Sequence, residues 1–167
     1  MGKDKVVISI GRQYGSGGRE IGRRLAEIFN IKFYDKELIT LAAKQSGFSE
    51  DVLKENDEKH NGSFLYSLVM GTYTGGDNLP LNHKLFLAQF DTIKKLAEEE
   101  SCVIIGRCAD YALEYNPNCV KAFIRADIDT RIKRAINDYG VNPETVEEKI
   151  KKIDKQRENY YNFYTGK

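Results

Sequence analysis

The chain has 167 residues with 26 basic and 25 acidic side chains, a composition typical of a globular protein with one hydrophobic core. Its formal net charge of +1 gives no general reason to expect binding to nucleic acid or to a membrane surface. The sequence contains no apolar run near the roughly 20 residues of a membrane span. No signal peptide precedes the first strand, so we expect a cytoplasmic protein.

The cysteines and histidines do not form a recognisable site pattern. Cys102, Cys108 and Cys119 lack the paired C-x-x-C spacing of a zinc site or redox motif, so we expect buried free thiols. His60 and His83 are isolated in polar surroundings. We therefore predict no protein-held metal site.

A glycine-rich turn near the N-terminus is the first functional pattern. Residues 6–10 are uncharged and favour a buried strand, and apolar residues recur at helical spacing from position 20 onward. Glycines between a strand and a helix can form a nest of backbone N–H groups, to which the helix dipole adds positive potential. We expect this nest to bind a phosphate through Gly15, Ser16, Gly17, Gly18, Arg19 and Glu20.

This turn departs from the standard phosphate-binding loop. In G-x-x-x-x-G-K-[ST] the lysine contacts the β- and γ-phosphates and the hydroxyl binds magnesium, but Gly18 and Arg19 occupy these two positions here. The dinucleotide fingerprint fails as well, because it needs a glycine where Glu20 stands. We expect Arg19 or Arg23 to supply the missing positive charge, with Arg12 as a further candidate if Arg19 does not. An ordinary structural glycine turn remains the alternative.

Charged residues also follow two later strand-like segments. Residues 31–35 end on Asp35, which either caps the next helix or presents a carboxylate at the edge of the sheet. The apolar residues 101–106 precede Arg107, which either clamps a phosphate or pairs with Asp110 at the surface.

Strands and helices alternate over the rest of the chain. A third strand is expected at 119–126, a helix at 129–139 and a last long helix from 144 to about 161. This alternation predicts an α/β fold with a parallel sheet covered by helices on both faces. Lys155 and Arg157 on the last helix are either lid cations or part of a solvated face.

Residues 45–82 are the least regular part of the chain. They include a loop at 71–80 and an apolar group at 64–70, so this segment packs on the domain, on a partner subunit or over a ligand. Because large exposed apolar patches usually mark interaction sites, we predict that the apolar group contributes to a homodimer contact.

Several motifs in order make the sequence resemble the cytidylate kinase-like family, a branch of the P-loop nucleoside monophosphate kinases. They are residues 10–22, Phe33-Tyr34-Asp35, residues 103–110, Asp154-Lys155-Gln156-Arg157 and Tyr164-Thr165-Gly166. The resemblance covers most of the chain. It implies a single three-layer α/β/α domain over 1–167, with an acceptor-binding helical insert at about 36–82 and a lid region at about 140–167.

The resemblance also implies roles for individual residues. Asp35 corresponds to the acid of the acceptor pocket and Arg107 to the arginine of the acceptor phosphate, while Arg131, Lys155 and Arg157 correspond to lid-side cations that bind substrate. With no lysine at Gly18, catalysis would depend on Arg19, Arg107 and Arg157. Related chains generally continue past the Tyr-Thr-Gly motif into another strand and helix. The resemblance leaves two alternatives: the sequence is truncated at Lys167, or the chain itself lacks a strand that helps hold the donor base.

Two functions follow from this resemblance. The first is a kinase that uses ATP and Mg²⁺ to phosphorylate a nucleoside monophosphate, with cytidylate as the first candidate. The alternative is a non-catalytic nucleotide- or phosphate-binding protein that retains a degenerate loop. In both cases the partner is a small-molecule nucleotide.

Overall fold

The structure is a computed structural model that describes residues 5–45 and 81–167. Four parallel strands form one sheet in the order β2-β3-β1-β4. The strands are β1 (Val7–Arg12), β2 (Lys32–Tyr34), β3 (Cys102–Ile105) and β4 (Cys119–Ile124). The predicted parallel α/β fold is confirmed.

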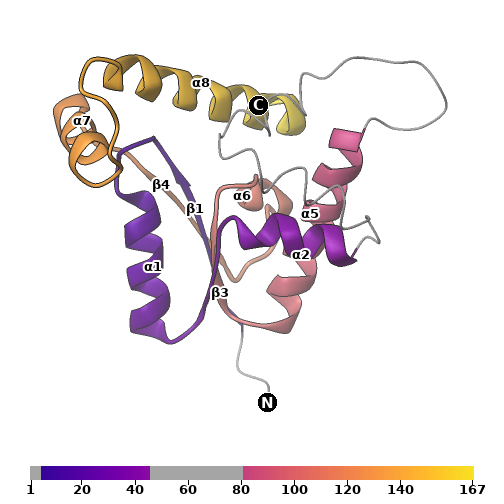
Figure 1. Cartoon of the computed structure of the whole chain (residues 1–167). Coiled ribbons are helices and arrows are strands. Elements are labelled where there is room, and N and C mark those ends of the chain that lie inside the picture. Colours follow the sequence, from indigo (N-terminus) through magenta and orange to yellow (C-terminus); the bar gives the residue numbers. More distant parts are fainter. Residues whose placement is uncertain (1–4, 46–80) are drawn as a thin grey trace, which may run out of the picture.

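Helices cover both faces of the sheet (Figure 1). Six helices are described: α1 (Gly18–Phe29), α2 (Glu37–Gln45), α5 (Leu81–Glu99), α6 (Ala109–Ala112), α7 (Ile128–Asn137) and α8 (Val146–Thr165). Alternate residues of the central strands enter two cores, as expected for a sheet buried on both faces. Ile10 and Val103 pack with Ala26 of α1, whereas Val7 and Ile104 pack with α2 and α5.

The order of the strands places a topological switch between β1 and β3. From β1 the chain passes through α1 to β2 at one edge, and from β3 it passes back across β1 to β4 at the other. Open α/β sheets bind ligands at the carboxyl ends of their strands at such a switch. In this chain these ends are Arg12 on β1 and Gly106, directly after β3.

Helices α7 and α8 lie at the carboxyl end of the sheet, where α8 runs across the end of β1 (Figure 1). Asp127 caps α7 by accepting the Thr130 N–H at 2.8 Å. Val146 and Ile150 of α8 pack with Ala135 of α7 in a third apolar cluster.

The predicted insert is described only at its start and end, by α2 and the first residues of α5. The apolar group at 64–70, and with it the predicted homodimer contact, lies outside the described residues. None of the described helices is long and apolar enough to cross a membrane.

Candidate functional site

Side chains of α7 and α8 hold the backbone of the glycine turn. Asp154 accepts the Tyr14 N–H at 2.7 Å, and Arg131 donates from Nε to the Tyr14 carbonyl at 2.8 Å. Arg131 also forms an ion pair with Asp154, while Arg134 donates to the Gly15 carbonyl at 2.8 Å. The carbonyl groups of Tyr14 and Gly15 are thus paired with protein groups, on the side of the turn that faces α7.

The predicted glycine conformations are present in this turn. Gly15 and Gly17 have φ angles of 76° and 82°, and a Cβ on Gly15 would lie 2.7 Å from the Arg131 carbonyl oxygen. Within the described part of the chain, the N–H groups of residues 17–20 donate no hydrogen bond. These amides at the start of α1 are the groups that the anion prediction requires.

Asp35 lies among arginines at the carboxyl end of β2. Its carboxylate is 2.7 Å from Arg19 Nε and 4.0 Å from Arg12 Nη2. The Asp35 side chain is only 6% exposed, compared with 22% for Arg12 and 44% for Arg19. Because two guanidinium groups face this carboxylate, its position favours the role at the sheet edge over helix capping.

Arg107 follows β3 in a strained backbone turn. Gly106, Arg107 and Cys108 have φ angles of 67°, 60° and 52°, and the last two are unfavourable for residues with a Cβ. Strain of this kind gathers at functional sites and supports a specific role for Arg107. Asp110, the alternative partner considered for Arg107, instead accepts the Tyr161 hydroxyl at 2.8 Å.

Arg157 extends from α8 to the same edge of the sheet. Its Nη1 donates to the Arg12 carbonyl at 3.1 Å, and its guanidinium lies 5.8 Å from the centre of the Tyr14 ring. Burial lowers the pKa of Arg157 and of Arg107 below the usual arginine value, and the like charge of Arg107 lowers the pKa of Arg157 further. Within the described residues, the edge therefore brings four guanidinium groups, those of Arg12, Arg19, Arg107 and Arg157, close to the Asp35 carboxylate.

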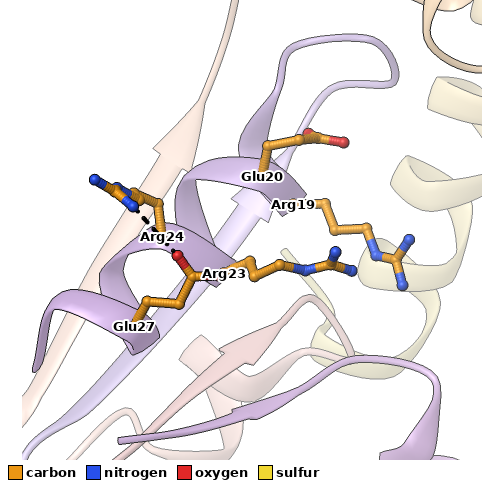
Figure 2. A pocket seen from close by; sticks show the side chains of 5 residues that line it. All are labelled: Arg19, Glu20, Arg23, Arg24 and Glu27. Atoms are coloured by element: carbon orange, nitrogen blue, oxygen red, sulfur yellow. Dashed lines mark hydrogen bonds and ion pairs between the residues drawn. The ribbon is translucent and has the colours of Figure 1, made fainter. Parts of the chain in front are cut away.

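A second group of charges lines a depression along the exposed side of α1 (Figure 2). Arg19 and Arg23 extend from the helix in the same direction, and Arg23 lies 5.9 Å from the Phe33 ring centre. Arg24 points away from them and pairs with Glu27 at 3.4 Å. Arg19 is thus the residue that links this surface to Asp35.

Two predicted substrate-binding residues have protein partners instead. Arg131 is buried between Tyr14 and Asp154, and Lys155 is exposed and pairs with Glu158 at 2.9 Å. Their contacts with a substrate stay predictions. The observed role of Arg131 is to support the glycine turn.

The sequence-based reasoning missed the residues that hold this turn. Asp154 is predicted only as part of a motif, and Arg134 is absent from the predicted site residues. The spacing of Asp154 and Arg157 on one helix could have suggested that both face the sheet.

The three cysteines are free, as expected, but only Cys102 and Cys108 are buried, whereas Cys119 is half-buried. Burial raises the pKa of both thiols to about 12, which disfavours the reactive thiolate near neutral pH. Among the described residues no group of three or more His, Cys, Asp or Glu side chains could hold a metal ion.

The model of the cytidylate kinase-like family matches residues 7–167. The chain belongs to this family. A crystal structure of an uncharacterized protein from Eubacterium ventriosum ATCC 27560 is 35% identical, with a TM-score of 0.68; the match covers 98% of this chain and 80% of that one. A search of the curated proteins found no match.

Membership of the family confirms the resemblance drawn from the motifs and indicates a nucleotide kinase as the general class. A nucleotide is accordingly the class of small molecule that the family suggests as substrate. The arginine cluster lies within the matched residues, at the edge of the sheet where α/β proteins bind ligands.

Proposed function

We propose that the protein transfers the γ-phosphoryl group of ATP to a nucleoside monophosphate, with cytidylate as the first acceptor to test. The observation that carries the proposal is the excess of guanidinium groups at the switch point, where Asp35 is the single carboxylate in contact with Arg12 and Arg19 within the described residues. Such an excess of positive charge destabilises the protein without a bound anion and is favourable beside a polyphosphate.

The reaction needs positioned charges more than a protein nucleophile. An oxygen of the acceptor phosphate attacks the γ-phosphorus, the bond from that phosphorus to the β,γ-bridging oxygen breaks, and ADP and a nucleoside diphosphate result. The free N–H groups of residues 17–20 would hold the donor phosphates. Arg107 and Arg157 would neutralise the charge shared by the two phosphates.

The described residues fit a magnesium ion carried by the nucleotide better than one held by the protein alone. The Asp35 carboxylate pairs with Arg19, whose N–H is one of the proposed phosphate-binding groups, and the Ser16 hydroxyl donates to the Gln13 carbonyl at 2.8 Å. Mg²⁺ commonly binds through one or two carboxylates together with substrate phosphates and water. When bound, it would supply charge neutralisation for the transferred group.

A coupled-enzyme assay of ADP formation tests the proposal with CMP, UMP, AMP, GMP and dCMP as acceptors. We expect turnover with at least one pyrimidine monophosphate. Arg107→Ala should lower kcat by at least about a hundredfold, as observed when one transition-state donor is removed. Arg24→Ala is the matched control, because that arginine pairs with Glu27 away from the cluster and should leave kcat unchanged.

One observation favours the non-catalytic alternative, namely the absence of the loop lysine at Gly18. A phosphate-binding protein would bind ATP and CMP in calorimetry but form no ADP with any acceptor. No binding of either nucleotide would contradict both functions.

A further inference from the structure

The side chain of Arg12 crosses the carboxyl edge of the sheet close to two glycines. A Cβ on Gly18 would lie 2.6 Å from Arg12 Cβ, and a Cβ on Gly106 would lie 2.2 Å from Arg12 Nη1. At its end, Nη2 is 4.0 Å from the Asp35 carboxylate. The side chain therefore starts beside the first turn of α1 and ends between the carboxyl ends of β3 and β2.

This path explains the glycine at position 18. Gly18 is the first residue of α1 and its φ is not positive, so its conformation does not require glycine. The surrounding side chains require glycine instead, because an added Cβ would lie 2.6 Å from Arg12 Cβ and 3.2 Å from Ile124 Cβ. A lysine at this position would overlap the base of the Arg12 side chain.

The Arg12 guanidinium has little compensation from the protein. It lies beside the charges of Arg157, Arg107 and Arg19, and it shares Asp35 with Arg19. Burial, and next the charge of Arg157, lower the pKa of Arg12 to about 9. A phosphate would compensate this charge, whereas Arg19 already has a carboxylate at 2.7 Å and is about half exposed.

We propose that Arg12 takes the place of the missing loop lysine and binds phosphate oxygens between the glycine turn and Asp35. The proposal rests on the phosphoryl-transfer function above. Arg19, Arg23 and Arg12 are all candidates from the sequence, and the geometry favours Arg12 over the first choice, Arg19. Gly18 and Gly106 serve this role because they leave room for one long side chain.

The test measures the affinity of inorganic pyrophosphate and of ATP by calorimetry in the intact protein. Arg12→Met keeps an unbranched apolar chain of similar width but removes the guanidinium, and it should weaken pyrophosphate binding by at least about tenfold, as for a lost charge-assisted hydrogen bond. Gly18→Ala should weaken it as well, because the new methyl group displaces the base of Arg12.

Gly22→Ala is the control, since Gly22 is also a buried glycine of α1 but an added Cβ there meets Ile105 and Ile10 in the core. It should lower Tm without changing pyrophosphate affinity. Arg12→Met should not lower Tm in the absence of ligand, because it removes a poorly compensated charge.

Unchanged pyrophosphate affinity in both Arg12→Met and Gly18→Ala would overturn the proposal, as would absence of pyrophosphate binding to the unmodified protein. A loss of affinity only in Arg19→Ala would return the role to Arg19. The proposed kinase function fails separately: if pyrophosphate binding depends on Arg12 but no acceptor yields ADP, the Arg12 site stands and the kinase is withdrawn.

Discussion

Three residues in a row after β3 adopt positive φ angles, and only the first is a glycine. A left-handed conformation costs a residue with a Cβ roughly 1 to 2 kcal/mol. The chain keeps an arginine at the centre of this turn, with its side chain beside Asp35 and Tyr160. The left-handed backbone at Arg107 therefore lowers the stability of the folded chain at the position where the charge of Arg107 is proposed to act.

The cost at Arg107 can be measured by comparing two variants. Both Arg107→Gly and Arg107→Ala remove the guanidinium, but only glycine adopts a φ of 60° without strain. We expect the free energy of unfolding in urea to be about 1 kcal/mol higher for Arg107→Gly than for Arg107→Ala. Both variants should have lost the kinase activity proposed above.

The same pair of substitutions at Arg24 is the control. Arg24 lies inside α1, where glycine is about 1 kcal/mol less stable than alanine. The order of the two variants should therefore be reversed. Equal stability of the two Arg107 variants would show that the turn is not strained.

Some site residues could be predicted from the sequence because their positions follow from strand ends. Asp35 and Arg107 each come directly after a strand-like segment, and parallel strands bring those ends together. The choice of Arg12 over Arg19 and Arg23 could not be made from the sequence, since it depends on the path of one side chain past Gly18 and Gly106. A sequence shows a missing lysine but not the side chain that occupies its space.

At the scale of elements, α7 and α8 support the glycine turn through Arg131 and Asp154. The Arg131 side chain is only 8% exposed. Removal of Asp154 would leave this buried guanidinium without its carboxylate partner. The Tyr14 N–H would lose its acceptor at the same time. The shape of the glycine turn therefore depends on helices more than a hundred residues away in the sequence.

We expect Asp154→Ala to lower the free energy of unfolding by about 3 kcal/mol, the lower end of the range for breaking a buried ion pair, because Asp154 is partly exposed. It should also weaken ATP binding, since the turn loses its support. Urea unfolding and calorimetry measure the two effects.

The control on the same helix is Glu158→Ala, which breaks only the exposed pair with Lys155. Exposed pairs contribute at most about 1 kcal/mol, and ATP affinity should be unchanged. Similar losses in the two variants would mean that Asp154 has no special role.

The elements themselves were predicted well where their periodicity was strong, as for β1 and α1. The last helix was expected to end at about residue 161, but α8 continues to Thr165. Its final turn is aromatic, and Tyr164 stacks on Phe86 of α5 with ring centres 3.9 Å apart and planes 7° apart. Tertiary packing of this kind extends a helix beyond what local sequence indicates.

At the scale of the whole molecule, α8 connects the two sides of the carboxyl edge (Figure 1). Its first half packs on α7 through Val146 and Ile150. Its second half packs on α5 through Tyr160 and Tyr164, both against Phe86. Arg157 lies between these two attachments and donates to the Arg12 carbonyl. The position of Arg157 at the carboxyl edge of the sheet therefore depends on the contacts of α8 with α7 and with α5.

Removing one attachment should loosen one half of α8 and not the other. Phe86 is 9% exposed, so Phe86→Ala removes a buried ring together with its stack on Tyr164, a change that typically costs about 3 kcal/mol or more. By hydrogen–deuterium exchange we expect amides of residues 158–165 to exchange at least about tenfold faster, while residues 146–152 stay protected by α7. ATP affinity should fall, because Arg157 would be held from one side only.

The control is Tyr115→Ala, at a residue that is 93% exposed, which should change neither the exchange rates nor the ATP affinity. Equal acceleration along the whole of α8 would indicate a general loss of stability and contradict two separate attachments.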